Sequence, residues 1–276
     1  MDAKLLLNLA NKYEISSFME QDPSQFLHWY DWVTDETKTA CTELASFIAA
    51  MLAFGNRRQF IPKIQSVLNN ADQTSGNILD WLKTGSYKKS FPTGSQKFYR
   101  FYSYDDMQTF FTELADIVRA QGTNGSLGQY FKSKWETSSL PLLADIISEA
   151  FPKSRIVPKG RSSANKRIHM FLRWMVRTDS PVDLGLWNWY PQSKLIIPLD
   201  THVLQEAQKL GLLPPAATAS RKTAIALTQA MEQFFPGDPC RADYALFGLG
   251  VSATSLPFDI GSGPTKQGKN SPVDCF

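Results

Sequence analysis

Two residues in the second half of the chain, Lys166 and Asp200, have types and settings suited to covalent chemistry on a sugar carbon. Lys166 opens the apolar segment KRIHMFLRWMVR, and Asp200 lies in IIPLDTHV, at the start of a second segment with helical periodicity. A neutral lysine amine attacks an electrophilic carbon, and the Schiff base that follows stores the intermediate covalently. A facing carboxylate accepts the proton or stabilises an oxocarbenium-like transition state. These residue types fit the removal of a base from deoxyribose.

The charge of Lys166 decides whether this chemistry is available, because an ordinary lysine is protonated at neutral pH. Nearby cations disfavour the ammonium form, and Lys159, Arg161 and Arg167 are expected to be such cations. The N-terminus of a helix adds further positive potential. A purely structural interpretation fits the same residues. Asp200 is a good helix N-cap, and Lys166 is then a solvated residue at a helix start. The residues alone leave both interpretations open.

The elements that must position these two residues are predicted to be helices. Apolar residues recur at three- and four-residue spacing along most of the chain, and strict two-residue alternation is scarce. Residues 195–199 are the only strand-like run, and Pro198 limits them to a short extended piece. The sequence therefore predicts an all-α protein with about ten helices. They cover residues 5–13, 43–54, 57–68, 78–82, 104–120, 140–150, 166–177, 201–210, 221–235 and 241–249.

The expected domain organisation is a single globular unit, residues 1–276, with two helical lobes. A central lobe spans residues 40–180 and ends in a degenerate hairpin and the Lys166 helix. The second lobe combines residues 1–39 with residues 195–255. Residues 256–276, which are rich in Gly, Lys and Pro, are expected to form a loose tail.

The composition limits the class of protein. With 276 residues, of which 43% are hydrophobic, the chain is long and apolar enough to bury a core. Its 29 Lys and Arg residues against 26 Asp and Glu give a net charge of +3, so any nucleic-acid surface must be local. Cys41, Cys240 and Cys275 lack CxxC spacing, which argues against a disulfide framework. Without a signal-peptide pattern or an apolar run of roughly 20 residues, a soluble cytoplasmic protein with no membrane association is expected.

Three blocks, KR…FLRWMVR, PLDTH and DP…DYALFGLG, resemble a family of uncharacterised bacterial proteins over nearly the whole chain. A loop, a lysine on an apolar helix and an aspartate before the next helix also resemble the helix-hairpin-helix DNA glycosylase superfamily, mainly over residues 43–210. The long connection between Lys166 and Asp200 is most similar to the archaeal 8-oxoguanine DNA glycosylase branch. This resemblance implies a two-lobed helical bundle of the glycosylase type, with Lys166 as nucleophile and Asp200 as the assisting carboxylate.

The resemblance also implies residues that hold the DNA. The usual hairpin is rich in glycine, so that backbone amides approach a phosphate, whereas the loop PKGRSS has one glycine and would depend on its cations and serines. Asn56 resembles the place of a residue that enters the duplex; alternatively, Gly55-Asn56 is a helix-ending turn. Arg57 and Arg58 would contact phosphates or form a solvated face. The expected DNA-binding residues are Lys159, Gly160, Arg161, Ser162, Ser163, Arg167, Asn56, Arg57 and Arg58.

Aromatic and histidine residues are the candidates for a base pocket. Trp187, Trp189 and Tyr190 lie in the connection between the two key helices, where their rings would stack on an extruded base or pin the loop to the core. His169, one turn after Lys166, and His202, two residues after Asp200, complete the expected base pocket, with a satisfied interior histidine as the alternative for His169. No pair of histidines has metal-binding spacing, so no metal is expected.

The sequence thus favours a DNA glycosylase, with or without AP-lyase activity, that removes an 8-oxoguanine-like damaged purine from double-stranded DNA. A monomer without a cofactor is expected. One alternative is a nucleic-acid-binding protein that keeps the glycosylase fold without its chemistry, and another is a helical scaffold with no nucleic-acid role. These hypotheses differ in whether the Lys166 amine and the Asp200 carboxylate face one cleft.

Overall fold

The computed structural model describes residues 3–254 and is mostly helical, which confirms the prediction of an all-α protein. Within this part of the chain, the only sheet is the antiparallel hairpin of β1 (Lys97–Tyr99) and β2 (Tyr102–Ser103). The α-helices are α1 (Ala3–Tyr13), α2 (Lys38–Leu52), α3 (Arg57–Ser75), α4 (Ile78–Thr84), α5 (Tyr87–Ser90), α6 (Tyr104–Ala120), α7 (Leu127–Thr137), α8 (Leu143–Glu149), α9 (Lys166–Val176), α10 (Thr201–Lys209), α11 (Arg221–Glu232) and α12 (Ala242–Thr254).

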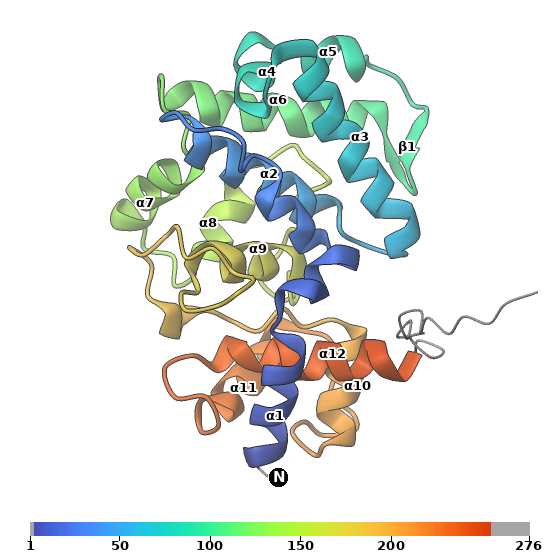
Figure 1. Ribbon diagram of the computed structural model, residues 1–276, viewed down its shortest axis with the longest axis vertical. Coiled ribbons are helices and arrows are strands. Elements are labelled where there is room, and N and C mark those ends of the chain that lie inside the picture. Colours follow the sequence, from blue (N-terminus) through green and yellow to red (C-terminus); the bar gives the residue numbers. More distant parts are fainter. Residues whose placement is uncertain (1–2, 255–276) are drawn as a thin grey trace, which may run out of the picture.

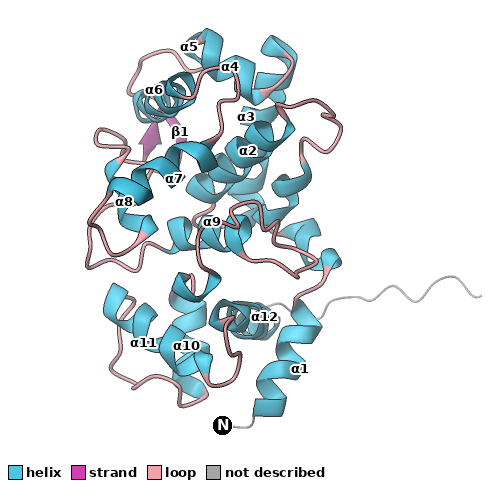
Figure 2. Ribbon diagram, turned by 90° about the vertical axis from the view of Figure 1, so that its left-hand side faces the viewer, coloured by secondary structure: helices cyan, strands magenta, loops and turns pink. Residues whose placement is uncertain are grey.

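The helices form two groups, one above the other in both ribbon views (Figures 1 and 2). The upper group contains α2 to α9 and the β1–β2 hairpin. The lower group contains α10, α11 and α12, with the N-terminal helix α1 packed against α12. The first and last helices of the described chain therefore both belong to the lower group, and the chain passes between the groups twice.

Helix α2 is the centre of the upper group and is buried nearly all round. It contacts α3, α4, α7, α9 and the 3₁₀-helix η2 (Pro23–His28). The buried carboxylate of Glu43 on this helix accepts hydrogen bonds from Trp187 Nε1 at 2.7 Å, Ser126 Oγ at 2.9 Å and Gly128 N at 3.1 Å. Because a buried carboxylate is costly unless it is hydrogen-bonded, these three donors tie α2 to α7 and to the connection after α9.

Buried arginines connect the two groups. Arg173 of α9 contacts Asp243 of α12, and Arg177 Nη1 lies 2.6 Å from Glu14, just after α1. Asp183 is shared between the arginines, at 3.2 Å from Arg173 Nε and 2.7 Å from Arg177 Nη1. Removal of one partner from such a network leaves an uncompensated buried charge. The network therefore holds α9 in a fixed position against the lower group.

The structure contains elements that the sequence analysis did not predict. Helix α7, the short helix α5, the 3₁₀-helices η1 (Ser16–Gln21) and η3 (Gln192–Lys194) and the β1–β2 hairpin were all missed. Residues 195–199 are extended and unpaired, as predicted. The expected second lobe contained all of residues 1–39, but η2 packs on α2 in the upper group. Residues 256–276, the expected tail, lie outside the described residues.

Among residues 3–254, no helix combines the length and apolar character that crossing a membrane requires. The same residues contain no cluster of His, Cys, Asp or Glu side chains able to hold a metal ion. Cys41 and Cys240 are buried, free cysteines, and Cys275 lies outside the described part.

Candidate active site

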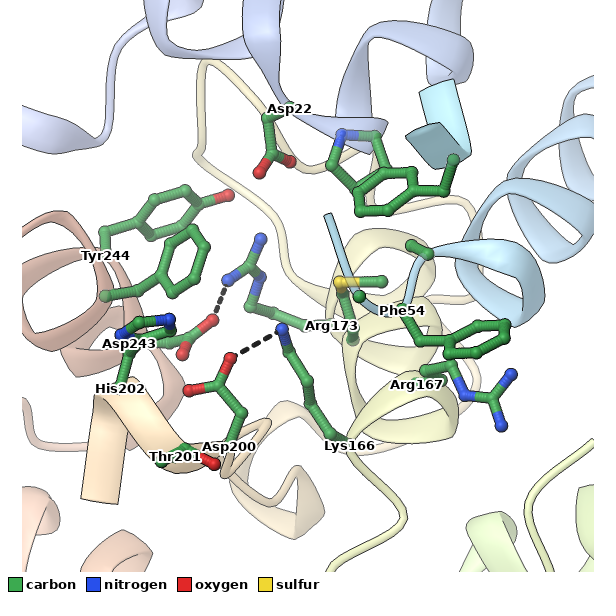
Figure 3. Close-up of a pocket in the computed structure, with 16 residues that line it drawn as sticks. Asp22, Phe54, Lys166, Arg167, Arg173, Asp200, Thr201, His202, Asp243 and Tyr244 are labelled. Carbon is green, nitrogen blue, oxygen red and sulfur yellow. Dashed lines mark hydrogen bonds and ion pairs between the residues drawn. The ribbon is translucent and has the colours of Figure 1, made fainter. Parts of the chain in front are cut away.

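Lys166 is the first residue of α9, and the residue before it turns the chain into the helix. Asn165 has a φ of +44°, in the left-handed region that asparagine enters more readily than most residues. Its Nδ2 donates to Gly160 O at 2.9 Å, and its own carbonyl accepts from Ile168 N at 3.0 Å. These bonds fix the start of α9, and the Lys166 side chain points from there toward Asp200 (Figure 3).

Asp200 is the N-cap of α10, as the sequence predicts. Its Oδ1 accepts a hydrogen bond from Val203 N at 2.9 Å. Its other oxygen, Oδ2, accepts one from Lys166 Nζ at 2.8 Å. The structural and chemical interpretations are therefore compatible, because one carboxylate oxygen caps the helix and the other contacts the amine.

The electrostatics of the pair fix its charge state. Burial alone would raise the pKa of Asp200, but the Lys166 ammonium and the Val203 amide lower that pKa below its ordinary value. Both side chains keep some solvent access, at 28% exposed for Lys166 and 20% for Asp200. Asp200 is thus a carboxylate at rest, and the pair lies at a half-buried position that a ligand can reach.

The pair lies in a pocket of about 460 Å³ between the two groups of helices (Figure 3). This volume falls within the roughly 300–1,000 Å³ of small-molecule sites, and the lining combines rings with a few polar groups, as such sites do. Both groups contribute to it. The lining residues are Asp22, Pro23, Ala53, Phe54, Gly55, Phe60, Lys166, Arg167, Met170, Arg173, Asp200, Thr201, His202, Asp243, Tyr244 and Phe247.

A second acidic side chain, Asp243, and a second basic side chain, Arg173, line the same pocket. Arg173 contacts Asp243, and its guanidinium lies 4.2 Å from the centroid of the Tyr244 ring. Burial raises the pKa of Asp243 to about 6, although Arg173 opposes that rise. Tyr244 in turn donates to Asp183 Oδ1 at 2.8 Å. The pocket therefore contains a rigidly held carboxyl group that titrates near neutral pH.

Most of these lining residues were not predicted from the sequence, although their spacing carries a signal. Arg173 follows Lys166 by seven residues, which is two helical turns, so both lie on one face of α9. Asp243 and Phe247 are four residues apart in DYALF and share a face of α12. A search for polar residues in register with Lys166 would have found Arg173. The partner helix α12 could not be identified in this way.

The loop expected to bind phosphate has its cations engaged within the protein. Lys159 Nζ donates to two backbone carbonyls at the end of α8, one of them at 2.7 Å. Arg161 pairs with Glu149 at 2.8 Å. Gly160 has a φ of +88° and open space around its Cα. Lys159 is thus held by the end of α8, whereas Arg161 is paired at an exposed position on the surface.

The serines of this loop contact the start of α11. Ser163 forms an isolated antiparallel bridge with Ser220, the N-cap of that helix. Ser162 O accepts a hydrogen bond from Arg221 N at 2.8 Å. The loop thus connects α9 to α11, and its backbone is partly occupied by this contact.

The residues expected at the duplex also have structural partners. Asn56 is the N-cap of α3, and its side chain accepts from Arg58 N at 2.9 Å. Arg57 lies 3.3 Å from Asp22 at the edge of the pocket. Arg58 is exposed. Asn56 is exposed as well, and Arg57 is half-buried.

Arg167 lines the pocket but belongs to its outer wall. Its guanidinium donates to Met51 O and, at 3.2 Å, to the Tyr102 hydroxyl. It also lies 5.1 Å from the centroid of the Phe54 ring. Figure 3 shows its side chain directed away from the Lys166–Asp200 pair, so Arg167 supports Phe54 rather than the ion pair.

The expected base-pocket residues are separated by the fold. His202 lines the pocket. Trp187 is buried in the core with its indole on Glu43, and Trp189 stacks on it at 5.5 Å. Tyr190 packs edge-on against another ring of the core. The three rings therefore pin the connection after α9 to the core, which is the structural alternative, and none of them lines the pocket.

His169 is also absent from the pocket lining, and its side chain is buried near Arg221 and Asp145. It is 4% exposed, and burial, assisted by Arg221, lowers its pKa from 6.5 to about 4. The unfolded chain therefore binds a proton between pH 6.5 and pH 4 that the folded chain does not bind. By linkage, we expect the free energy of unfolding to fall by about 3 kcal/mol through this group as the pH drops across that window.

Urea unfolding of the wild type and of His169→Phe, measured from pH 7 to pH 4, checks this expectation. The variant has no ionisable ring, so its stability should fall less steeply with decreasing pH, whatever its stability at pH 7. Identical slopes for the two proteins would show that His169 is not the group that titrates.

Comparison with known proteins gives a family match. A family described as a protein of unknown function (DUF2400) matches residues 22–252. The matched range contains Lys166, Asp200 and every residue that lines the pocket. No curated protein and no solved structure matches the chain.

Proposed function

The chain belongs to the DUF2400 family, and we propose from its site that it is a DNA glycosylase with associated AP-lyase activity. In this proposal the two groups of helices are the lobes of a helix-hairpin-helix glycosylase bundle, and the substrate is double-stranded DNA with an 8-oxoguanine-like purine. One observation carries the proposal. Lys166 Nζ and Asp200 Oδ2, 34 residues apart in sequence, lie 2.8 Å apart in a pocket with room for a nucleobase.

The reaction begins with proton transfer within the ion pair once the flipped nucleotide has filled the pocket. Asp200 Oδ2 is in place to take the proton from the Lys166 ammonium. The amine lone pair then bonds to C1′, and the bond from C1′ to the base breaks. The base leaves with that electron pair and takes up a proton. Opening of the sugar gives an imine between Nζ and C1′, and the lyase step follows by loss of a C2′ proton and of the 3′-phosphate.

The remaining pocket residues supply recognition of the base. Phe54 and Phe247 offer ring faces, and Lys166 Nζ lies 5.2 Å from the centroid of the Phe247 ring. Asp243 and Arg173 offer an acceptor and donors of fixed orientation, which is what a purine edge requires. Because Asp243 titrates near pH 6, it is also suited to exchange a proton with the departing base.

Trapping with sodium borohydride tests the proposal directly. The protein is incubated with duplexes that each contain one damaged purine, beginning with 8-oxoguanine, and borohydride reduces any imine to a stable amine. We expect a covalent protein–DNA adduct and released base with at least one damaged duplex, and neither with the undamaged control. If no duplex of the panel yields adduct or free base, the enzymatic proposal is wrong.

A second candidate is a nucleic-acid-binding protein without catalysis, and one observation favours it. Both oxygens of Asp200 already have protein partners, at Val203 N and at Lys166 Nζ, so the pair is stable without a substrate. This candidate predicts duplex binding that weakens with salt. It also predicts that Lys166→Gln leaves binding nearly unchanged and that the wild type releases no base.

A further inference from the structure

The tip of the β1–β2 hairpin, Arg100–Phe101, lies against the wall of the pocket. The ring centroid of Phe101 is 5.2 Å from that of Phe54, and the Arg100 guanidinium is 5.5 Å from the Phe54 ring. Tyr99 OH donates to Phe54 O at 2.5 Å, which anchors the hairpin to this wall. Gly55 also lines the pocket, and a side chain there would collide with Arg100. The hairpin tip and the pocket edge are therefore one continuous surface.

Phe101 is 51% exposed although it belongs to a cluster of aromatic rings. Single exposed apolar residues are common and mean little alone. Here, however, the exposed ring contacts Phe54, a residue of the pocket lining. A planar side chain half in solvent at the edge of a base-sized pocket has the position and shape to stack on a nucleobase.

The charge around the tip is complementary to phosphate. Residues 94–103 and 55–71 contain no acidic side chain, whereas they carry Lys97, Arg100, Arg57, Arg58 and Lys63. Lys97, Arg100 and Arg58 are exposed. In Figure 1 the hairpin and the beginning of α3 lie on the same side of the upper group. A local cationic surface of this kind attracts a nucleic-acid backbone even when the net charge of the chain is small.

The backbone of the tip adds support. Arg100 has a φ of +51°, and hairpin turns with a positive φ at the first central residue usually place glycine there. An arginine at this position is strained, and such strain is often found where a side chain contacts a ligand. The contact of Arg100 with Phe54 is one reason for an arginine at this position. The strain is therefore weaker support for a functional role than the position and charge of the tip.

We propose that the Arg100–Phe101 tip occupies the gap that a flipped nucleotide leaves in the duplex. Phe101 stacks on the bases that flank the gap, and Arg100, with Lys97 and Arg58, contacts the neighbouring phosphates. The proposal rests on the proposed function, because a nucleotide enters the pocket only if it leaves a gap at the pocket edge. It also supplies the side chain that enters the duplex, since the side chain of Asn56 is engaged as a helix cap.

Fluorescence anisotropy with the full chain and two otherwise identical labelled duplexes tests the proposal. One duplex contains a tetrahydrofuran abasic analogue, and the other is intact. We expect the wild type to prefer the abasic duplex and Phe101→Ala to lose about tenfold or more of that affinity, with little change on the intact duplex. Arg100→Gly removes the strained cation, so it should weaken binding to both duplexes and lower the salt dependence while keeping or raising thermal stability.

Trp32→Ala is the matched control, because Trp32 is 61% exposed and lies outside both the pocket lining and the hairpin. Trp32→Ala should retain the preference for the abasic duplex. Phe101→Leu should retain part of it, and because leucine keeps an apolar side chain at this position, this variant also controls for a folding defect. If Phe101→Ala keeps the full preference, or loses affinity for both duplexes equally, the proposal is overturned while adduct formation still stands. If Phe101-dependent binding occurs without base release from any damaged duplex, the catalytic proposal alone fails.

Discussion

Replacing Lys166 by glutamine is expected to eliminate the borohydride adduct and to slow base release by at least about a thousandfold. The amide nitrogen of glutamine has no available lone pair, so it cannot form the bond to C1′. The fold should survive the change, because Lys166 is 28% exposed and its ion pair is half-buried, which limits its contribution to the free energy of unfolding to about 1 kcal/mol. Gel analysis of trapped complexes and single-turnover base release measure the two effects.

Lys222→Gln provides the control for the loss of a positive charge. Lys222 is exposed near the start of α11, as Lys166 lies at the start of α9, and it does not line the pocket. This variant should form adduct at the wild-type rate. An adduct that persists in Lys166→Gln would identify another amine as the nucleophile and remove the central role given to Lys166.

Local signals in the sequence were sufficient to place Lys166 and Asp200 at the starts of two helices. The Asp200 cap and the apolar stripe after Lys166 depend on residues within one or two turns, and both predicted helices begin at the residue expected. A helix start also fixes the direction of its first side chains. This is why the amine and the carboxylate could be placed at helix ends before their separation was known.

Contacts between distant segments were not predictable in this way. The indole of Trp187 lies on Glu43, 144 residues away, and no local pattern distinguishes that burial from a ring that lines a pocket. Arg173 and Asp243 are 70 residues apart, and their contact depends on how α12 packs against α9. The predicted base pocket consequently named the rings nearest in sequence, whereas the structure lines the pocket with residues from α12 and from the end of α2.

The β1–β2 hairpin was not predicted because it also lacks a local sequence signal. Its strands have three and two residues, too few to show alternation, and its turn holds Arg100 where glycine or asparagine would signal a hairpin. Sequence rules fail most readily where a side chain is placed against local preference. Such positions are also where a functional role is most worth testing.

Replacing Asp200 by asparagine is expected to separate the two tasks of this residue. Asparagine caps a helix about as well as aspartate, so the bond to Val203 N and the free energy of unfolding should change by less than about 1 kcal/mol. The variant is neutral, however, and it can neither accept the proton of Lys166 nor stabilise positive charge on the sugar. Base release should therefore slow by about 10²- to 10⁴-fold. Single-turnover assays and urea unfolding of the same preparation measure both quantities.

Asp200→Ala completes the comparison, because alanine removes the cap as well as the charge. It should be as slow as Asp200→Asn in base release but less stable by about 1 kcal/mol, the usual value of an N-cap. If Asp200 were only a cap, the loss of its charge alone would not slow base release. Asp200→Asn would then be as active as the wild type, and activity in Asp200→Ala would fall only as far as its folded fraction falls. An active Asp200→Asn protein would thus show that the 2.8 Å contact with Lys166 is only a structural ion pair and that the carboxylate does not assist the reaction.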